Sequence, residues 1–351
     1  MARHYKLLTP ACIALVIVTL SLLASCGHEA GVIFPQALDA PRWPAPPDPA
    51  RVRYVGQLAG SDDLKPSVSG FQGIGAALFG SAPAQSIQTP MAVCTDGADR
   101  VFVADTSAHV VHVFDLKDRA YARWSPEGHP MKSPVGLAYD AAGKRLLVAD
   151  SEAGTIYILD STGKFTGELA SGQFKRPCGL AIDPANGRIF VADVEAHQVV
   201  VVSLSGEVIQ RIGGRGDALG QFNYPTNVAL DRKGRLYVSD SLNFRVQQFG
   251  PDLQPIRQFG KQGDMPGYFA QPKGVAVDPD GHVYVIDSQF EAMQIFDDTG
   301  ALLLNVGEQG SGPGEFWLPT GIFIDSRGRI WITDSYNHRI QVFDYLPEAQ
   351  S

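Results

Sequence analysis

The chain has 351 residues, of which 44% are hydrophobic and 19% charged, a composition that supplies a large core and excludes a disordered or fibrous protein. Its formal net charge of −8 argues against nucleic-acid binding, because that function needs a basic surface to replace phosphate counterions. The 37 glycines and 24 prolines predict many turns, while four scattered cysteines are too few for a disulfide scaffold or a cysteine-based zinc site.

Residues 1–25 have the pattern of a bacterial export signal. Arg3 and Lys6 precede an apolar run, residues 11–23, that is too short for a good membrane span. The run ends at Leu23-Ala24-Ser25-Cys26, which resembles the lipobox of bacterial lipoproteins, so we expect Cys26 to be acylated. The alternatives are an ordinary signal peptide or an uncleaved anchor. The resemblance implies attachment to a lipid bilayer of the cell envelope, and Gly27 after the cysteine implies the periplasmic side of the outer membrane.

The segments before the first repeat have three different patterns. Residues 26–50 contain six prolines and no hydrophobic period, which predicts an extended tether. Residues 51–60 form a strand with no repeat of its own. Residues 61–89 form an insertion in which four apolar residues have helical spacing, so we expect a short helix packed over the rim, or alternatively a lid or docking element. These four residues are Phe71, Ile74, Leu78 and Phe79.

From residue 89 onward the chain repeats one unit six times. Each unit opens with a proline and an apolar strand, crosses a turn, and continues into a second strand that ends in aspartate. The opening prolines are 43–48 residues apart, and such a period with four short strands per unit is typical of a β-propeller. The prolines are Pro90, Pro134, Pro177, Pro225, Pro272 and Pro319, and the aspartates are Asp105, Asp150, Asp193, Asp240, Asp287 and Asp334.

The hydrophobic pattern of the strands also predicts how the ring closes. Second strands such as residues 101–104 and 329–333 are nearly continuous apolar runs, which indicates burial on both faces between neighbouring blades. The sixth unit lacks an outermost strand, because only seven residues follow Asp344. We therefore expect residues 51–60 to complete the last blade and leave no open sheet edge. The predicted domain is an all-β, six-bladed propeller over residues 51–345, followed by a tail, 346–351.

The repeated sequences resemble NHL repeats. The likeness rests on Gly-Val-Ala-Val-Asp at residues 274–278, on the segment 334–344 and on glycine-rich links with the pattern Gly-x-x-Gly-x-x-x-Gly-x-Phe, and it covers residues 89–344. It is strongest in units 4 to 6 and weaker in units 1 and 2, whose closing links lack the glycines. The resemblance implies a six-bladed β-propeller that serves mostly as a binding platform and occasionally as an enzyme.

Internal repetition separates structural positions from candidate functional ones. A residue present in every unit serves a need of every blade, so we expect the six aspartates to cap backbone N–H groups of nearby turns. In an up-and-down blade the turn between strands 2 and 3 and the link to the next blade emerge on one face, and positions there vary between units. One variable ring follows the opening prolines, at the mouth of the channel: Met91, Val135, Cys178, Thr226, Lys273 and Thr320. The other is the fourth residue after each terminal aspartate: His109, Gly154, His197, Phe244, Glu291 and His338.

We expect a binding site on this variable face. A site for a protein partner should combine aromatic anchors with charges from several blades. For Arg245 the alternative is that it braces neighbouring blades, as Arg339 would in the sixth unit. The binding-face candidates are His109, His197, Phe244, Arg245, Lys273, Glu291, Tyr336 and His338.

The sequence predicts no catalytic residue, metal or cofactor. Residues 193–199 resemble one zinc-ligand segment of the peptidylamidoglycolate lyases, which are also six-bladed propellers. In that family the other histidines directly follow opening prolines, and no such position holds histidine here. His109, His197 and His338 belong to units 1, 3 and 6, which argues against a shared zinc ion. Cys94 and Cys178 lie in nonadjacent units, so we expect no disulfide between them.

The sequence thus favours a lipid-anchored, noncatalytic platform on the bacterial cell envelope that binds a protein or peptide partner. Two alternatives stay open. One is a propeller enzyme, lyase- or lactonase-like, with a metal or polar site at the channel mouth. The other is a binder of a sugar or another small ligand.

Overall fold

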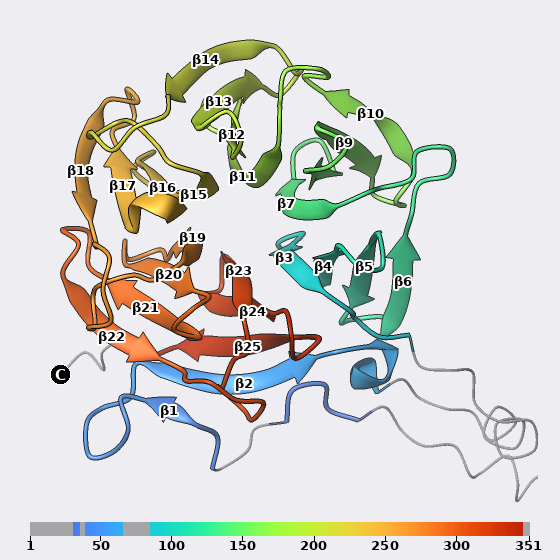
Figure 1. Ribbon diagram of the computed structural model, residues 1–351. Helices are drawn as coiled ribbons and strands as arrows, with labels where there is room; N and C mark the ends of the chain where they lie inside the picture. The colour runs from blue at the N-terminus through green and yellow to red at the C-terminus, as the bar shows by residue number, and fades with distance from the viewer. Residues whose placement is uncertain (1–30, 36–38, 66–84, 347–351) are drawn as a thin grey trace, which may run out of the picture.

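The chain forms a closed ring of six antiparallel sheets around a central channel (Figure 1). The computed structural model describes residues 31–35, 39–65 and 85–346. The ring confirms the all-β, six-bladed propeller that the repeats predict. The export signal, Cys26, most of the 61–89 insertion and the tail after Leu346 lie outside the described residues. Within those residues the helices are two short 3-10 turns, η1 (Ser61–Leu64) and η2 (Ser241–Asn243), and no helix is long and apolar enough to cross a membrane.

The first three blades each contain four strands in up-and-down order, with the first strand at the channel. Blade 1 consists of β3 (Pro90–Thr95), β4 (Arg100–Asp105), β5 (Val110–Asp115) and β6 (Ala120–Trp124). Blade 2 consists of β7 (Pro134–Asp140), β8 (Arg145–Asp150), β9 (Thr155–Asp160) and β10 (Phe165–Leu169). Blade 3 consists of β11 (Pro177–Asp183), β12 (Arg188–Asp193), β13 (Gln198–Ser203) and β14 (Val208–Gly213).

Blades 4 and 5 repeat this order, and blade 6 takes its outer strands from the N-terminal part of the chain. Blade 4 consists of β15 (Pro225–Leu230), β16 (Leu236–Asp240), β17 (Arg245–Phe249) and β18 (Pro255–Phe259). Blade 5 consists of β19 (Pro272–Val277), β20 (Val283–Asp287), β21 (Ala292–Phe296) and β22 (Leu302–Val306). Blade 6 consists of β23 (Pro319–Ile324), β24 (Arg329–Asp334), β25 (Arg339–Tyr345), β2 (Val52–Leu58) and β1 (Arg42–Trp43).

The residues that mark the sequence repeats coincide with the ends of strands in the structure. Every opening proline is the first residue of an inner strand, and every repeated aspartate is the last residue of the second strand. The two are direct partners across the strand pair, as in Pro225↔Asp240 and Pro272↔Asp287. Proline suits this place because it lacks an N–H and is tolerated at the start of a strand.

The ring closes between the two ends of the domain, as the missing sixth outer strand predicts. β2 pairs with β25 in antiparallel register, from Val52↔Tyr345 to Leu58↔Ile340. Val52 and Leu58 are completely buried at the two ends of β2. The closing strand therefore covers the edge of β25 that the sixth repeat leaves open.

Part of the proline-rich segment is more ordered than its composition predicts. β1 adds a fifth strand outside β2, through Arg42↔Arg53 and Trp43↔Val52. The ring of Phe34 packs edge-on against Trp331, at a centroid distance of 6.1 Å, and Trp43 packs against Phe343 at 5.9 Å. Two aromatic side chains among the prolines thus attach this segment to blade 6, so that it does not act as a free spacer over residues 31–35 and 39–50.

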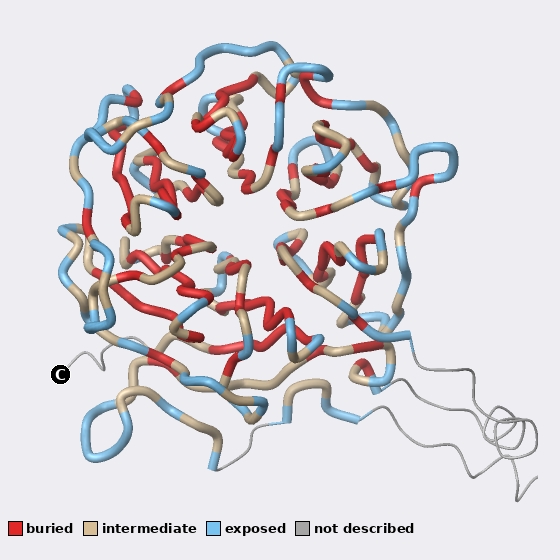
Figure 2. Tube along the Cα trace, viewed as in Figure 1, coloured by how far each residue is buried: buried red, intermediate tan, exposed pale blue. Residues whose placement is uncertain are grey.

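The core lies between blades rather than inside one central cluster. The second strands are buried along nearly their whole length, which confirms the prediction from their continuous apolar sequences. The largest completely buried side chains include Trp331, Tyr237 and Tyr284. Figure 2 shows buried residues on the inner strands and exposed residues along the outer rim. Each blade is therefore stabilised by its two neighbours, and loss of the seam strand exposes the core between blades.

Deletion of residues 1–60 tests the closing strand. Removing β2 exposes the hydrogen-bonding edge of β25, so we expect aggregation and a clearly lower thermal midpoint than for deletion of residues 1–50, which leaves β2 in place. Thermal unfolding and light scattering of the two truncated proteins measure the difference. Equal midpoints would show that β2 contributes nothing to ring closure.

Candidate functional site

The loops that vary between blades gather on one side of the ring, which we call the loop face. It carries the turns after the repeated aspartates and the links that lead to the inner strands. The mouth of the channel opens among these segments, between residues such as Arg176, Tyr224 and Leu242. The turns are residues 106–109, 151–154, 194–197, 241–244, 288–291 and 335–338, and the links between blades are residues 125–133, 170–176, 214–224, 260–271 and 307–318.

The six repeated aspartates hold the loop face together. Their side chains are completely buried and accept hydrogen bonds from the link before their blade. Asp287, for example, accepts from the N–H groups of Ala270 (2.8 Å) and Gln271 (3.0 Å) and also from those of Gln289 and Phe290 in the following turn. One carboxylate thus fixes a link and a turn, which confirms the capping role that repetition predicts.

In blade 1 this carboxylate has an additional side-chain partner. His112 Nε2 lies 2.9 Å from Asp105, and His112 Nδ1 lies 2.5 Å from the Tyr121 hydroxyl. Burial would raise the pKa of Asp105, but the hydrogen bonds from His112 and from the N–H groups of Gln88 and Ala108 outweigh burial and lower that pKa to about 2.

The arginine candidate of blade 4 belongs to the same structural network. Arg245 is only 4% exposed and donates to Asp240 at 2.8 Å and to the carbonyls of Ala218 and Gln221 in the link. Arg339 makes the equivalent contacts in blade 6, with Asp334, Gly312 and Glu315. Arg245 therefore stabilises the link of the loop face from a buried position. Its role is the structural one given above as the alternative to partner binding.

The six residues of the second variable ring share an unusual backbone conformation. All six of its residues have φ between 54° and 66°, in the left-handed region: His109, Gly154, His197, Phe244, Glu291 and His338. Histidine is enriched at such positions relative to most side chains. The recurrence of histidine here therefore has a conformational explanation.

The three histidines of this ring contact three different links and do not converge. His109 Nδ1 donates to the carbonyl of Lys132 at 2.6 Å, and His338 Nδ1 is hydrogen-bonded to the carbonyl of Gln88. His197 Nδ1 accepts from the N–H of Tyr224 at 3.2 Å, and the two rings pack edge-on. Each histidine joins its blade to the link of the next blade.

Besides Gly154, the ring contains Glu291 and Phe244, whose side chains are at least partly buried. Glu291 is buried, and burial raises its pKa, while hydrogen bonds from the Leu318 N–H and the Gln309 side chain act in the opposite direction. Phe244 is half-buried and packs against the core between blades 4 and 5. Among the candidates, His109, His338 and Tyr336 are exposed, and Lys273 is half-buried at the mouth of the channel.

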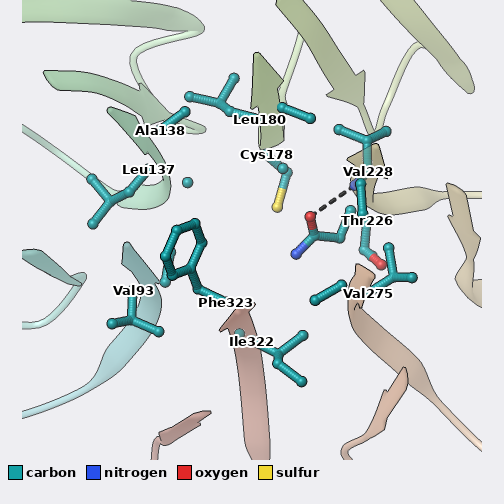
Figure 3. A pocket seen from close by; sticks show the side chains of 18 of the residues that line it. Val93, Leu137, Ala138, Cys178, Leu180, Thr226, Val228, Val275, Ile322 and Phe323 are labelled. Atoms are coloured by element: carbon teal, nitrogen blue, oxygen red, sulfur yellow. Dashed lines mark hydrogen bonds between the residues drawn. The ribbon is translucent and has the colours of Figure 1, made fainter. Parts of the chain in front are cut away.

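The first variable ring surrounds the channel, as its position after the prolines predicts. All six residues, Met91, Val135, Cys178, Thr226, Lys273 and Thr320, line a central cavity of about 330 Å³. The wall below them is mostly apolar and includes Ala138, Leu230, Val277 and Phe323. Figure 3 shows the Phe323 ring beside the channel, whereas Leu137, Val228 and Val275 point away from it, into the core between blades. The cavity lining among the described residues contains no Asp, Glu or His.

Several residues of the site lie at positions that the sequence reasoning did not single out. Asn227 lines the cavity at the second position after an opening proline, where four blades have glycine. Arg176 immediately precedes an opening proline and lies at the mouth. Trp317, in the link before blade 6, is 48% exposed and packs against Tyr336, which is 54% exposed, at a ring distance of 5.6 Å. The same comparison between repeats, extended by one or two positions, would have found all three.

Exposed apolar side chains are unevenly distributed over the two faces. Of the large hydrophobic residues exposed in the described part of the chain, six lie in loops of the loop face, four on outer strands and one, Val32, in the N-terminal segment; none lies in a turn of the opposite face. The six come from the loops of blades 4 to 6, and we call them the apolar patch: Leu219, Tyr224, Leu242, Met265, Trp317 and Tyr336. The matching turn positions of blades 1 to 3 are Ser107, Glu152 and Glu195. The loop face thus has an apolar half and a polar half.

One group of described residues has metal-ligand chemistry, and it lies on the opposite face. Asp278, Asp280 and His282 have potential ligand atoms within 4.8 Å of one another. Asp278 already accepts the N–H groups of Asp280, Gly281 and His282, and its second oxygen bonds the His282 ring. In blades 4 and 2 the same turn holds an Asp–Arg pair, Asp231–Arg235 and Asp140–Arg145. The group is therefore a variant of a repeated turn.

Comparison with known families agrees with the architecture. Residues 276–347 match a family described as a 6-bladed beta-propeller, and residues 174–202 and 222–249 match the NHL repeat. No curated protein sequence matches the chain significantly.

Solved structures with a similar ring include proteins of different functions. A gluconolactonase from Xanthomonas campestris has a TM-score of 0.63 and 17% identity, over 92% of this chain and 100% of that chain. An auxiliary nutrient binding protein from Bacteroides thetaiotaomicron has a TM-score of 0.60 and 15% identity, over 74% and 69%. Virginiamycin B lyase from Staphylococcus aureus has a TM-score of 0.55 and 13% identity, over 74% and 96%. At such identities the likeness shows the fold alone.

Substitution of Asp240 by alanine tests the capping network. The change removes the carboxylate that pairs with the buried Arg245 and accepts the N–H of Asn223, so we expect a loss of about 3–5 kcal/mol in the free energy of unfolding. Asp264→Ala is the control, because Asp264 is exposed in the next link, and should change stability by less than about 0.5 kcal/mol. Urea unfolding measures both. A similar small effect for the two variants would contradict the structural role.

Proposed function

This chain is a six-bladed β-propeller built of NHL repeats, and we propose that it is a noncatalytic platform that binds a protein or peptide partner at the bacterial cell envelope. In this proposal an acylated Cys26 holds the protein on the bilayer, on the periplasmic side of the outer membrane. The partner binds the loop face over blades 4 to 6. The proposal gives the variable loops a function while the repeated residues maintain the ring.

The observation that supports this proposal is the apolar patch. Exposed apolar side chains concentrated on one face of a protein are typical of interaction sites. Trp317 and Tyr336 form its aromatic centre, and Trp and Tyr are enriched among residues that dominate binding energies. The links that carry the patch are also fixed by side chains from below, such as Gln341, which accepts the N–H of Gly314 and donates to the carbonyl of Glu315. A rigid surface loses less conformational entropy on binding.

The enzyme alternative has less support from the channel. Propeller catalysis by a bound cation would need carboxylate or imidazole ligands at the channel, whereas the polar groups of the described lining are Thr226, Asn227, Lys273 and Thr320, with Cys178 and Tyr139. The similar gluconolactonase and lyase structures share the ring at identities that do not carry an activity over.

Alanine at Trp317 and Tyr336 together tests the patch. A photo-crosslinking residue at position 336 should capture a partner in intact cells, and the double variant should weaken binding of that purified partner by about 2–4 kcal/mol, because both aromatic anchors lose their contact area. The thermal midpoint should stay close to that of the unchanged protein, since both side chains are about half exposed.

The matched control is Ile256→Ala together with Leu303→Ala. Both residues are about as exposed as the aromatic pair but lie on outer strands β18 and β22. We expect the control to bind the partner normally. Equal loss of binding in the two double variants, or crosslinking from position 256 and not from position 336, would place the partner away from the loop face.

Cys26→Ala tests the anchor separately. The unchanged protein should incorporate labelled fatty acid and partition into detergent, because two or more acyl chains bind a bilayer stably. The variant should do neither and should keep the thermal midpoint of the ring. Unchanged partitioning of the variant would show that the protein is not a lipoprotein.

A further inference from the structure

The central channel has a charge pattern that the platform function does not use. Two cations lie at its mouth: Lys273, at the start of β19, and Arg176, just before β11. Within the described part of the chain, neither side chain has a hydrogen bond or an ion pair, and neither the cavity nor its mouth is lined by Asp or Glu. The mouth is therefore locally cationic in a protein with a formal net charge of −8.

The environment of Lys273 favours a counter-anion. The side chain is half-buried at the channel mouth, and burial lowers the pKa of its ammonium group; the Cys178 thiol acts in the opposite direction, and Arg176 lowers this pKa further. A partly desolvated cation without a partner is unfavourable, and an anion between the two cations would stabilise both.

The channel also offers an unused hydrogen-bond donor below the mouth. Asn227 Oδ1 accepts the N–H of Val228 at 2.7 Å, the bond drawn in Figure 3. This bond orients the amide, and its Nδ2 has no partner among the described residues. Asn227 stands where blades 2, 3, 5 and 6 have Gly136, Gly179, Gly274 and Gly321, so blade 4 alone among the six contributes an amide here.

Below these polar groups the cavity is apolar and small. Most of its lining is apolar, including Val135, Ala138, Leu230 and Phe323, and its volume of about 330 Å³ is at the lower end of the range for ligand sites. A ligand for this shape has one anionic end and one compact apolar end.

We propose that the channel mouth binds a small organic carboxylate, with the carboxylate between Lys273 and Arg176 and a branched or aromatic apolar group in the cavity below. The site goes beyond the partner-binding function because it uses the inner ring and none of the exposed aromatic pair. Failure of one proposal therefore leaves the other standing.

Calorimetry of the full chain with 4-methylpentanoate is the first test. We expect saturable binding of this probe, and binding at least about tenfold weaker for 4-methylpentanamide, which has no charge, and for acetate, which has no apolar group. Alkylation of Cys178 by iodoacetamide, followed by peptide mass spectrometry, locates the ligand. The sulfur of Cys178 points into the channel (Figure 3), so bound 4-methylpentanoate should slow its alkylation.

Variants at the two cations test the charge recognition. Lys273→Met should weaken binding of 4-methylpentanoate about tenfold or more, and Lys273→Arg should retain it, since a charged hydrogen bond is stronger than a neutral one. Arg176→Met should weaken binding less, because Arg176 is exposed. The control is Arg232→Met, which removes an exposed cation from a turn of the opposite face.

The pH dependence gives an independent readout. The ionised carboxylate binds the protonated ammonium, so affinity should be constant above the range in which the carboxylate itself is protonated, about pH 4–5, and should fall as pH rises through the Lys273 pKa, which lies below that of an ordinary lysine. Lys273→Arg should remove this fall. Cys178→Ser should retain it, which separates the lysine from ionisation of the neighbouring thiol.

Several outcomes would overturn the proposal. They are no saturable binding of 4-methylpentanoate, equal binding of its amide, unchanged affinity in a folded Lys273→Met variant, and no protection of Cys178 from alkylation. Equal weakening by Arg232→Met would show that the probe responds only to net charge.

Discussion

The buried aspartate at the end of each second strand is the constraint on which the other features of this ring depend. It lies opposite the opening proline of its own blade. Its carboxylate therefore lies between the link that leads into the blade and the turn that follows the second strand. By accepting N–H groups from both, it fixes loop conformation without prescribing the loop side chains. The loop sequences are then free to differ between blades. A fixed ring with a variable face follows directly from this one interaction.

The same carboxylate is used differently from blade to blade. In blade 1 the imidazole of His112 contributes to a pKa of about 2 for Asp105. Asp287, in blade 5, relies on backbone N–H groups, and burial raises its pKa. In blades 4 and 6 an arginine and a glutamine join the network. Left-handed glycines stand where these links begin, such as Gly213 at the end of β14, where an added Cβ would lie 2.2 Å from the Phe222 ring. The apolar patch therefore rests on the part of the face with the most internal support.

The sequence predicts the ring almost completely because its signals are repeated. Six prolines, six aspartates and an unmatched strand determine the blade boundaries and the seam, and the structure confirms each. The candidate site is less accessible to the same reasoning. Variation between repeats identifies positions that differ. It does not distinguish a side chain available to a partner from one that is chosen for its backbone conformation or that hydrogen-bonds a backbone group. His109 and His338 vary and are exposed, yet they occupy a left-handed turn and bond the neighbouring link. Trp317 lies in a link, outside the two rings that were compared, and its exposure follows only from three-dimensional packing.

The inner strands show why Asn227 is informative. Neighbouring inner strands approach so closely that glycine is required at most blades: a Cβ on Gly274 would lie 2.7 Å from the carbonyl oxygen of Thr320. At the same position of blade 4 the chain accepts a larger, polar side chain, and a Cβ on the facing Gly179 would lie 2.5 Å from the Asn227 Cα. The Oδ1 of this amide accepts the Val228 N–H, but its Nδ2 has no partner among the described residues, and an unpaired polar group costs free energy. Its coincidence with Lys273 and Arg176, which also lack partners among the described residues, is best understood as three donors arranged for an acceptor that the ring itself does not provide.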